Sequence, residues 1–228
     1  MGRHLFIPLA ATPQTVTHSA VVFDLFGTLV TVDDTPEPAA VVADELAVSG
    51  VAVPDDWAAA YSEPHIDAPA GAEVPLPDHV AAALASRGID VAEATARQAV
   101  IDAFEPTIET VSGAVEAVAA ASEAGSVGLL SNCAVPELVA KTLGRSALDP
   151  ASFDAIVASV DCGWRKPDPR AFETIADRLG VEAAELVVVG DTPETDGGIT
   201  DHGGEFVDIA DTPLAELPAR FSEEELCR

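Results

Sequence analysis

From Ala20 onward, short runs of Val, Leu and Ile alternate with segments of about 10 to 15 residues that have helical periodicity. Such uninterrupted apolar runs are typical of parallel strands that are buried on both faces. The runs that predict strands are Ala20–Phe23, Val127–Leu130, Phe153–Ala158, Leu186–Val189 and Glu205–Ile209. Helices are predicted at Ser112–Glu123, Pro136–Leu143 and Asp168–Leu179. The alternation predicts an α/β fold with a doubly wound parallel sheet.

This alternation is interrupted between residues 33 and 107. These roughly 75 residues contain no convincing buried strand, only Ala-rich helical stretches. A connection of this length is too long for one sheet, so we expect an all-helical domain inserted after the first strand. The prediction is a Rossmann-like core of five strands, 20–32 plus 108–228, and a helical insert, 33–107. Within the insert, the Pro-rich stretch 63–79 is predicted as a loop.

The charge balance excludes two classes of partner. The chain carries 39 acidic residues against 11 Lys plus Arg, which gives a formal net charge of -28. Such a surface repels nucleic acid and anionic membranes. It is also typical of halophilic proteins from cells with molar cytoplasmic salt, where the Debye length falls to about 3 Å. An ordinary acidic cytosolic protein is the alternative, and unfolding measured against KCl concentration separates the two.

Neither the N-terminus nor the cysteines indicate secretion. Residues 1–19 hold a short apolar run that is broken by Pro8, so we predict a loose extension and no signal peptide. No apolar stretch approaches the roughly 18 residues needed to cross a bilayer. Cys133, Cys162 and Cys227 are too few and too scattered for a disulfide framework or a CxxC metal site. We expect a soluble cytoplasmic protein, whose oligomeric state the sequence does not indicate.

Polar residues follow the first two predicted strands. The first strand ends in Asp24 and continues into "FGTL", which places Gly27 and Thr28 close by. The next strand of the core ends in Ser131 and Asn132. In parallel sheets, ligands bind just beyond the carboxyl ends of the strands. These side chains are therefore expected to lie near one another.

Two further motifs supply the remaining ionisable groups. Lys166 lies just before a helix whose predicted N-cap is Asp168, with Pro169 in its first turn. The fourth strand ends in Asp191, and Asp196 follows five residues later. Each motif alone has a structural explanation, as a cap, a turn or a solvated lysine. Their combination in this order indicates one site.

Together, the stretches "DLFGT", "LLSN", "RKPDP" and "VVGDTPETD" resemble the motifs of the haloacid dehalogenase superfamily of hydrolases. The resemblance covers residues 20–32 and about 108–210. The helical insert resembles the cap of that family in its four-helix, C1-type form. The resemblance implies a hydrolase that acts on a small molecule, with a cap that sets the choice of substrate.

The residues also form a chemically coherent site. Asp24 can attack an electrophilic phosphorus or carbon and form a covalent ester that water later cleaves. Attack on an anionic phosphate needs charge neutralisation, which a hard cation held by Asp24 and Asp191 supplies, with Mg2+ the usual choice. Lys166 would pair with the phosphate and hold the nucleophile ionised. Asp196 would complete or orient the metal shell.

The other motif residues are assigned to the substrate and the metal. Thr28 and Ser131 would donate hydrogen bonds to the transferring oxygens. Gly27 and Asn132 would contribute to phosphate binding, and Phe26 would lend its backbone carbonyl to the metal. The expected ligands are therefore Mg2+ and a small phosphorylated molecule.

Phe26 separates the reactions that remain open. In the family's phosphatases a second Asp usually occupies this position, where it protonates the leaving alcohol and later activates water. The family's dehalogenases also lack that acid, and their first motif resembles "DLYGT". However, they carry an Arg early in the cap, and this sequence has no Arg between Arg3 and Arg87. Their fourth motif also lacks the paired acids that are present here as Asp191 and Asp196.

Three hypotheses follow. A Mg2+-dependent phosphatase with an aspartyl-phosphate at Asp24 is favoured, and a 2-haloacid dehalogenase-type hydrolase is the alternative. The third is a weakened member that binds a phosphorylated ligand or a protein partner without turnover. Phosphonoacetaldehyde hydrolase, another relative without the second Asp, uses a cap lysine, but the insert contains no Lys. Candidates to replace the missing acid are His65, Glu63 and His79, each of which also has a structural explanation.

Overall fold

A five-stranded parallel sheet forms the centre of the protein, in the order β5-β4-β1-β6-β7. The computed structural model describes residues 20–32, 37–105 and 107–225, so the predicted extension 1–19 lies outside the described residues. The strands are β1 (Ala20–Phe23), β4 (Ser126–Ser131), β5 (Ala155–Ala158), β6 (Leu186–Gly190) and β7 (Glu205–Asp208). All five predicted strands are confirmed, with ends that differ by at most two residues.

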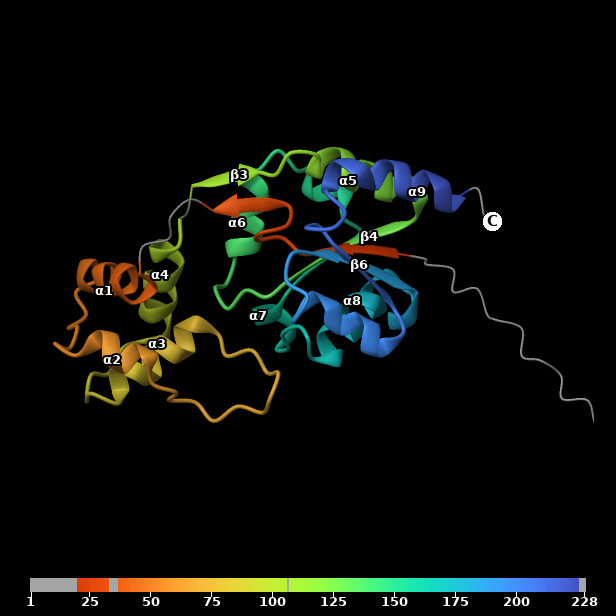
Figure 1. Cartoon of the computed structure of the whole chain (residues 1–228). Helices are drawn as coiled ribbons and strands as arrows, with labels where there is room; N and C mark the ends of the chain where they lie inside the picture. Colours follow the sequence, from red (N-terminus) through yellow and green to blue (C-terminus); the bar gives the residue numbers. More distant parts are fainter. Residues whose placement is uncertain (1–19, 33–36, 106, 226–228) are drawn as a thin grey trace, which may run out of the picture.

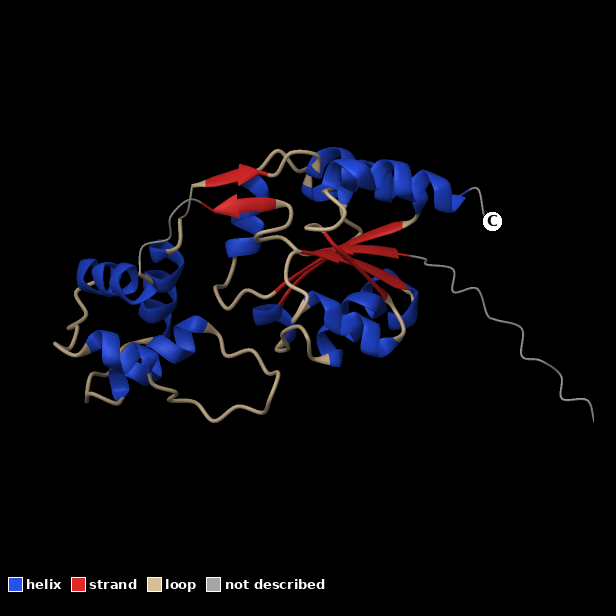
Figure 2. Ribbon diagram, viewed as in Figure 1, coloured by secondary structure: helices blue, strands red, loops and turns tan. Residues whose placement is uncertain are grey.

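Helices cover both faces of the sheet, which Figure 2 shows nearly edge-on. Helices α5 (Ala114–Ala124) and α9 (Leu217–Glu225) lie over one face, and α8 (Pro169–Leu179) lies against the other. The shorter helices are α6 (Leu138–Arg145), α7 (Ser159–Cys162) and the 3-10 turns Pro150–Ser152, Ala183–Glu185, Asp196–His202 and Leu214–Glu216. The doubly wound α/β fold is therefore confirmed. In the described ranges no helix is long and apolar enough to cross a bilayer.

The strands are buried because their side chains face two separate apolar cores. In β1, Val21 and Phe23 belong to the core that includes α5, while Ala20 and Val22 belong to the core that includes α8. All four side chains are buried. Burial on both faces explains the uninterrupted apolar sequence of the strand. Polar groups of these strands can therefore gather only where the strands end.

The insert is attached to the core through a short two-stranded ribbon. Strand β2 (Val30–Val32) pairs antiparallel with β3 (Ile108–Thr110), so the chain leaves the core and returns to it side by side. Between them, the described residues contain α1 (Pro38–Val48), α2 (Trp57–Ser62), α3 (Leu76–Ala85) and α4 (Glu93–Ala103). Figure 1 shows these helices together on one side of the sheet. The sequence did not predict the ribbon, and the limits of the two domains stay a prediction.

The predicted loop at 63–79 ends earlier than expected. Helix α3 already begins at Leu76, with Pro77 in its first turn. Pro at this place is compatible with a helix because its missing N–H would have no intrahelical partner there. The interpretation of this stretch as a loop was therefore wrong for its last four residues. The remainder, between α2 and α3, is a loop.

Candidate active site

The site lies at the carboxyl end of β1, between β4 and β6. Asp24 directly follows β1, and its amide donates to the Val189 carbonyl at 2.9 Å, which extends the pairing with β6 by one residue. After β1, the chain first adds β4 and β5 on one side of β1 and then adds β6 and β7 on the other side. The point where the strand order switches therefore lies between β1 and β6. Ligands bind at such points in open α/β sheets.

A buried lysine connects two of the predicted carboxylates. The Lys166 ammonium donates to Asp24 Oδ1 at 2.7 Å, to Asp196 Oδ1 at 2.6 Å and to the Leu130 carbonyl at 2.7 Å. Lys166, Asp24 and Asp196 are all buried. All three protons of the ammonium are therefore used, and its position is fixed by β4 as well as by the two acids.

Burial has a large effect on the Asp24 carboxyl. It raises the pKa of Asp24 to about 6, because the loss of water outweighs the attraction of Lys166, and the nearby Asp196 charge acts in the same direction as burial. Two carboxylates share one ammonium at this place. The side chains therefore leave an excess of negative charge at this place, which suits a cation.

Asn132 holds the backbone of Lys166 from both sides. The Lys166 amide donates to Asn132 Oδ1 at 2.8 Å, and Asn132 Nδ2 donates to the Lys166 carbonyl at 2.9 Å. This pair of hydrogen bonds joins the loop after β4 to the segment before α8. The side-chain amide of Asn132 is thus engaged with the protein, and its contribution to phosphate binding stays a prediction.

Asp191 is the exposed member of the acidic group. It follows β6, and its Oδ1 accepts hydrogen bonds from Thr28 Oγ1 and from Thr192 Oγ1, both at 3.3 Å. Thr28 is fully buried. Gly27 has a φ of 89°, and a Cβ atom at Gly27 would overlap the Asp191 carboxylate. Glycine is therefore required at position 27 for two reasons, the backbone conformation and the close approach of Asp191.

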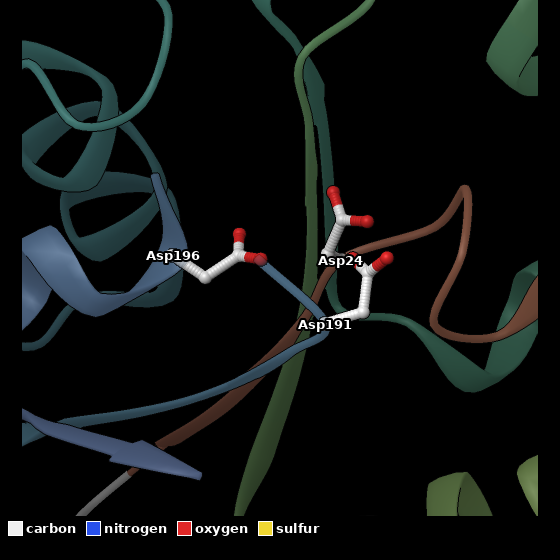
Figure 3. Close-up of side chains that lie close together, drawn as sticks. All are labelled: Asp24, Asp191 and Asp196. Carbon is white, nitrogen blue, oxygen red and sulfur yellow. The ribbon is translucent and has the colours of Figure 1, made fainter. Parts of the chain in front are cut away.

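The three aspartates form one potential cation site. Carboxylate oxygens of Asp24, Asp191 and Asp196 all lie within 4.8 Å of one another. Figure 3 shows Asp24 and Asp191 side by side and Asp196 pointing toward them from the start of the 3-10 turn after β6. A donor set of carboxylate oxygens suits hard cations such as Mg2+ and Ca2+. The residues present thus fit a divalent metal.

Ser131 has an unused hydroxyl at the end of β4. Its Oγ is buried and has no hydrogen-bond partner within the described part of the chain. A buried hydroxyl without a partner costs free energy, about 1 to 3 kcal/mol. A ligand oxygen at the site would provide the missing partner.

Phe26 brings no proton donor or acceptor to the site through its side chain. It is half-buried, packs against the apolar core and forms an isolated bridge with Val30. A phenyl ring thus stands where the family's phosphatases usually carry a second acid. The coordination of a metal by the Phe26 carbonyl stays a prediction.

The candidate acids of the insert are engaged elsewhere. His65 Nε2 is hydrogen-bonded to the Ala60 carbonyl at 2.6 Å, and His79 Nε2 to the Tyr61 carbonyl at 2.7 Å. Glu63 forms an ion pair with Arg87 at 2.9 Å. These contacts all lie inside the insert, which favours the structural explanation of the three residues.

Thr192 is a site residue that the sequence motifs did not single out. Its hydroxyl donates to Asp191, and its amide donates to Asp196 Oδ2 at 3.2 Å. One residue thus contacts both acids of the fourth motif. The sequence signal that could have identified Thr192 as a site residue is its position directly after Asp191.

Comparisons with known proteins agree on the family and the fold. The sequence matches the haloacid dehalogenase-like hydrolases over residues 18–198. A search of the curated proteins finds no match. The similar solved structures include a 2-haloacid dehalogenase from Pseudomonas syringae pv. Tomato DC3000, at 18% identity, with 90% of this chain and 98% of that chain covered and a TM-score of 0.58.

The similar structures also include one in complex with phosphate and one described as a predicted phosphatase. CbbY from Rhodobacter sphaeroides in complex with phosphate has 18% identity, with 83% of this chain and 85% of that chain covered and a TM-score of 0.56. A predicted phosphoglycolate phosphatase from Haemophilus somnus 129pt has 15% identity, 86% coverage of both chains and a TM-score of 0.54. At these identities the likeness shows the fold and does not separate the two reactions.

Proposed function

Because the chain belongs to the haloacid dehalogenase-like hydrolases, we propose that it is a Mg2+-dependent phosphatase that forms an aspartyl-phosphate at Asp24. Its substrate is a small phosphorylated metabolite. The observation that carries the proposal is the group of three carboxylates, since oxygens of Asp24, Asp191 and Asp196 lie within 4.8 Å of one another. A haloacid carries one negative charge and a phosphomonoester about two, so a cation-binding site suits the phosphate better.

The predicted metal has a specific task in this proposal. Mg2+ bound by the three aspartates would neutralise the negative charge of the phosphoryl group and of the attacking carboxylate. Thr28 and Thr192 hold Asp191 through its Oδ1, and Thr192 also holds Asp196 through its amide. These contacts orient two of the proposed ligands before the metal arrives.

Asp24 is the proposed nucleophile. One of its carboxylate oxygens attacks the phosphorus, and a P–O bond to Asp24 forms as the P–O bond to the leaving group breaks. Water then attacks the phosphorus of the aspartyl-phosphate, which releases inorganic phosphate and restores the carboxylate. The Lys166 ammonium, 2.7 Å from Asp24 Oδ1, favours the ionised form of the nucleophile.

The remaining residues bind the transferring oxygens in this proposal. Ser131 has a buried hydroxyl without a partner in the described residues, and it would donate to a phosphoryl oxygen. Thr28 is fully buried and its hydroxyl donates to Asp191 at 3.3 Å, so it would donate to a phosphoryl oxygen by turning its single proton away from Asp191. Asn132 keeps Lys166 in place through its two backbone hydrogen bonds.

Phe26 restricts the leaving group. Without an acid at this position, the leaving oxygen departs as an anion and takes its proton from water. The loss of general acid help costs roughly 10²- to 10⁴-fold in rate for an alkyl phosphate. The proposed substrates are therefore acyl phosphates or phenol-like phosphate esters, whose oxyanions are stable without immediate protonation.

A 2-haloacid dehalogenase is the second candidate, and Phe26 is the observation in its favour. Halide leaves without a proton, so this reaction needs no acid at position 26. Against it stand the Asp191 and Asp196 pair and the lack of any Arg between Arg3 and Arg87. Such a guanidinium would be needed to hold the carboxylate of a haloacid.

A substrate panel tests the proposal. Phosphomonoesters, acyl phosphates and 2-haloacids are assayed in molar KCl, with Mg2+ and with EDTA, for the wild type and for Asp24→Asn. We expect phosphate release that needs Mg2+, is fastest for acyl phosphates and is absent in the variant. Halide release that persists in EDTA would overturn the phosphatase. Stabilisation by phosphate without any turnover would indicate a binding protein.

A further inference from the structure

A segment of the loop between α2 and α3 crosses from the insert to the core. Figure 1 shows this loop extending from the insert toward α7. We call residues 69–76 the strap. Two backbone hydrogen bonds join it to the segment before Lys166, from Glu73 N to Gly163 O at 2.9 Å and from Arg165 N to Gly71 O at 3.0 Å. Together they form the isolated antiparallel bridge between Ala72 and Trp164.

The side chain of Glu73 makes a contact that the backbone pairing does not require. Glu73 Oε2 accepts a hydrogen bond from Ser159 Oγ at 2.5 Å. Ser159 Oγ in turn accepts from the Cys133 amide at 2.8 Å, and Ser159 is fully buried. An ionised carboxylate can only accept, so the single hydroxyl proton of Ser159 points to Glu73. The lone pairs of Ser159 are then free for the amide of Cys133.

This hydrogen-bond chain ends in the proposed active site. Cys133 follows Ser131 and Asn132, in the loop after β4. We call residues 132–134, which directly follow Ser131 at the end of β4, the β4 loop. Asn132 fixes one part of it to the Lys166 backbone. At its other end, the strap contacts it directly, because Leu76 N donates to the Ala134 carbonyl at 2.9 Å.

The insert thus contributes two of the contacts that hold the β4 loop. One is direct, through Leu76, and the other runs through Glu73 and Ser159. A donor that binds transferring oxygens has to be held within a fraction of an ångström to be effective. Ser131 itself is paired with Ala158 in the sheet, so the insert can act on its hydroxyl through the loop that follows it.

We propose that Glu73 is a positioning residue for the β4 loop, which acts through Ser159 and makes the placement of Ser131 depend on the docked strap. The expected effect on turnover rests on the proposed function, because it treats Ser131 as a donor to the substrate. The expected effect on the exchange rate of the β4 loop is independent of the proposed function. Glu73 uses its carboxylate on Ser159, so it acts at a distance from the reacting atoms.

The first test needs no substrate. Amide hydrogen exchange is measured on the full chain in molar KCl for the wild type, Glu73→Ala, Glu73→Gln and the control Asp67→Ala. Asp67 is an exposed acid in the same loop. A lost hydrogen bond to a charged group corresponds to roughly 10-fold or more in a local opening equilibrium. We expect the Cys133 amide to exchange about 10-fold faster in Glu73→Ala, and near the wild-type rate in Glu73→Gln and in the control.

The second test asks whether the effect passes through Ser159. In a Ser159→Ala background, Glu73→Ala should add little to the exchange rate of Cys133, because the chain is already broken. Glu73→Gln keeps an acceptor oxygen and the shape of the side chain, so it separates positioning from a folding defect. The proposal would be overturned by any one of three results. The Cys133 amide could exchange at the wild-type rate in Glu73→Ala, it could exchange equally fast in Asp67→Ala, or the effects of Glu73→Ala and Ser159→Ala could be fully additive.

Kinetics then distinguish this proposal from the proposed function. With an active substrate from the panel, we expect Glu73→Ala to lower kcat by about 10-fold, with the Mg2+ requirement unchanged. Faster exchange of Cys133 in a protein that turns over no substrate would support the positioning role and contradict the phosphatase. Phosphatase activity with an unaltered kcat in Glu73→Ala would support the phosphatase and overturn the positioning role.

Discussion

The core and the insert each hold one cation between two carboxylates, but in opposite surroundings. In the core, Lys166 lies between Asp24 and Asp196, with side-chain exposures of 2%, 10% and 1%. In the insert, Arg87 lies between Asp56 and Glu63, whose side chains are 57% and 51% exposed. The contact distances are similar. The surrounding water, and not the geometry, therefore decides what each group can do.

Water changes the electrostatics of the two groups in different directions. In the insert, the Arg87 guanidinium lowers the pKa of Glu63, as expected for an ion pair in which hydrogen bonding outweighs desolvation. In the core, burial raises the pKa of Asp24 to about 6 although Lys166 is equally close. The buried group is thus held in a costly state that a metal and a substrate can relieve, while the exposed group is already satisfied.

The largest expected effect is the removal of the buried cation. Lys166→Met leaves Asp24 and Asp196 buried without their partner, so we expect the free energy of unfolding to fall by about 3 to 5 kcal/mol and turnover to be lost. Denaturant unfolding in molar KCl measures the change. Lys141→Met is the matched control, because Lys141 is the other lysine of the sequence and has no ion pair with a described residue. A similar loss in both variants would contradict the comparison.

The second largest effect on stability is expected from metal binding. Mg2+ at about 100 times its Kd should raise the free energy of unfolding by about 2.7 kcal/mol in the wild type. Asp191→Asn should remove most of this gain, since Asp191 is one of the three converging carboxylates. Asp56→Asn, in the exposed group, should leave it intact. Thermal unfolding at increasing Mg2+ concentration measures this stabilisation. An equal stabilisation of Asp191→Asn and Asp56→Asn would mean that the metal binds elsewhere.

The loss of the Asp24 carboxylate, the proposed nucleophile, should stabilise the protein in EDTA. Asp24 has a raised pKa in the folded state, so its ionised form destabilises the fold above about pH 6 and the penalty fades as the pH falls toward 4. We expect Asp24→Asn to be more stable by about 1 to 2 kcal/mol at pH 7.5 in EDTA, with no turnover. The difference should shrink below pH 6. A less stable variant at pH 7.5 would show that the Lys166 contact outweighs burial.

The smallest effect is expected in the exposed group. Arg87→Gln should lower the melting temperature slightly in dilute buffer, because exposed ion pairs are weak and screened by salt. In molar KCl the difference from the wild type should vanish. A loss as large as that of Lys166→Met would mean that exposure does not separate the two groups.

Sequence reasoning found the sheet, and the grouping of residues at its strand ends, because both depend on short local patterns. The five strands are continuous apolar runs, and Asp24, Ser131 and Asp191 lie where three of these runs end. Parallel strands bring such ends together whatever the details of packing. That these residues come together was thus predictable from strand order and strand ends.

Contacts between distant segments were not predictable in this way. Strands β2 and β3 have three residues each, too few for a periodic pattern. The strap lies in a Pro-rich stretch without periodicity, so its pairing with Trp164 had no local signal. The hydrogen bonds of Asn132 to Lys166 also depend on how two loops meet in space.

The β2–β3 ribbon has a consequence for how such a protein can change. Its register places Val32 opposite Ile108. Val32 is the last described residue before the insert, and Ile108 is the first strand residue after it. Two antiparallel strands can be joined by a turn of about two residues. A whole set of helices can therefore be exchanged at this pair while the strand ends that carry the aspartates remain in place. A new substrate specificity can thus arise when a different insert is joined at the Val32–Ile108 pair, while the sheet that carries the aspartates stays unchanged.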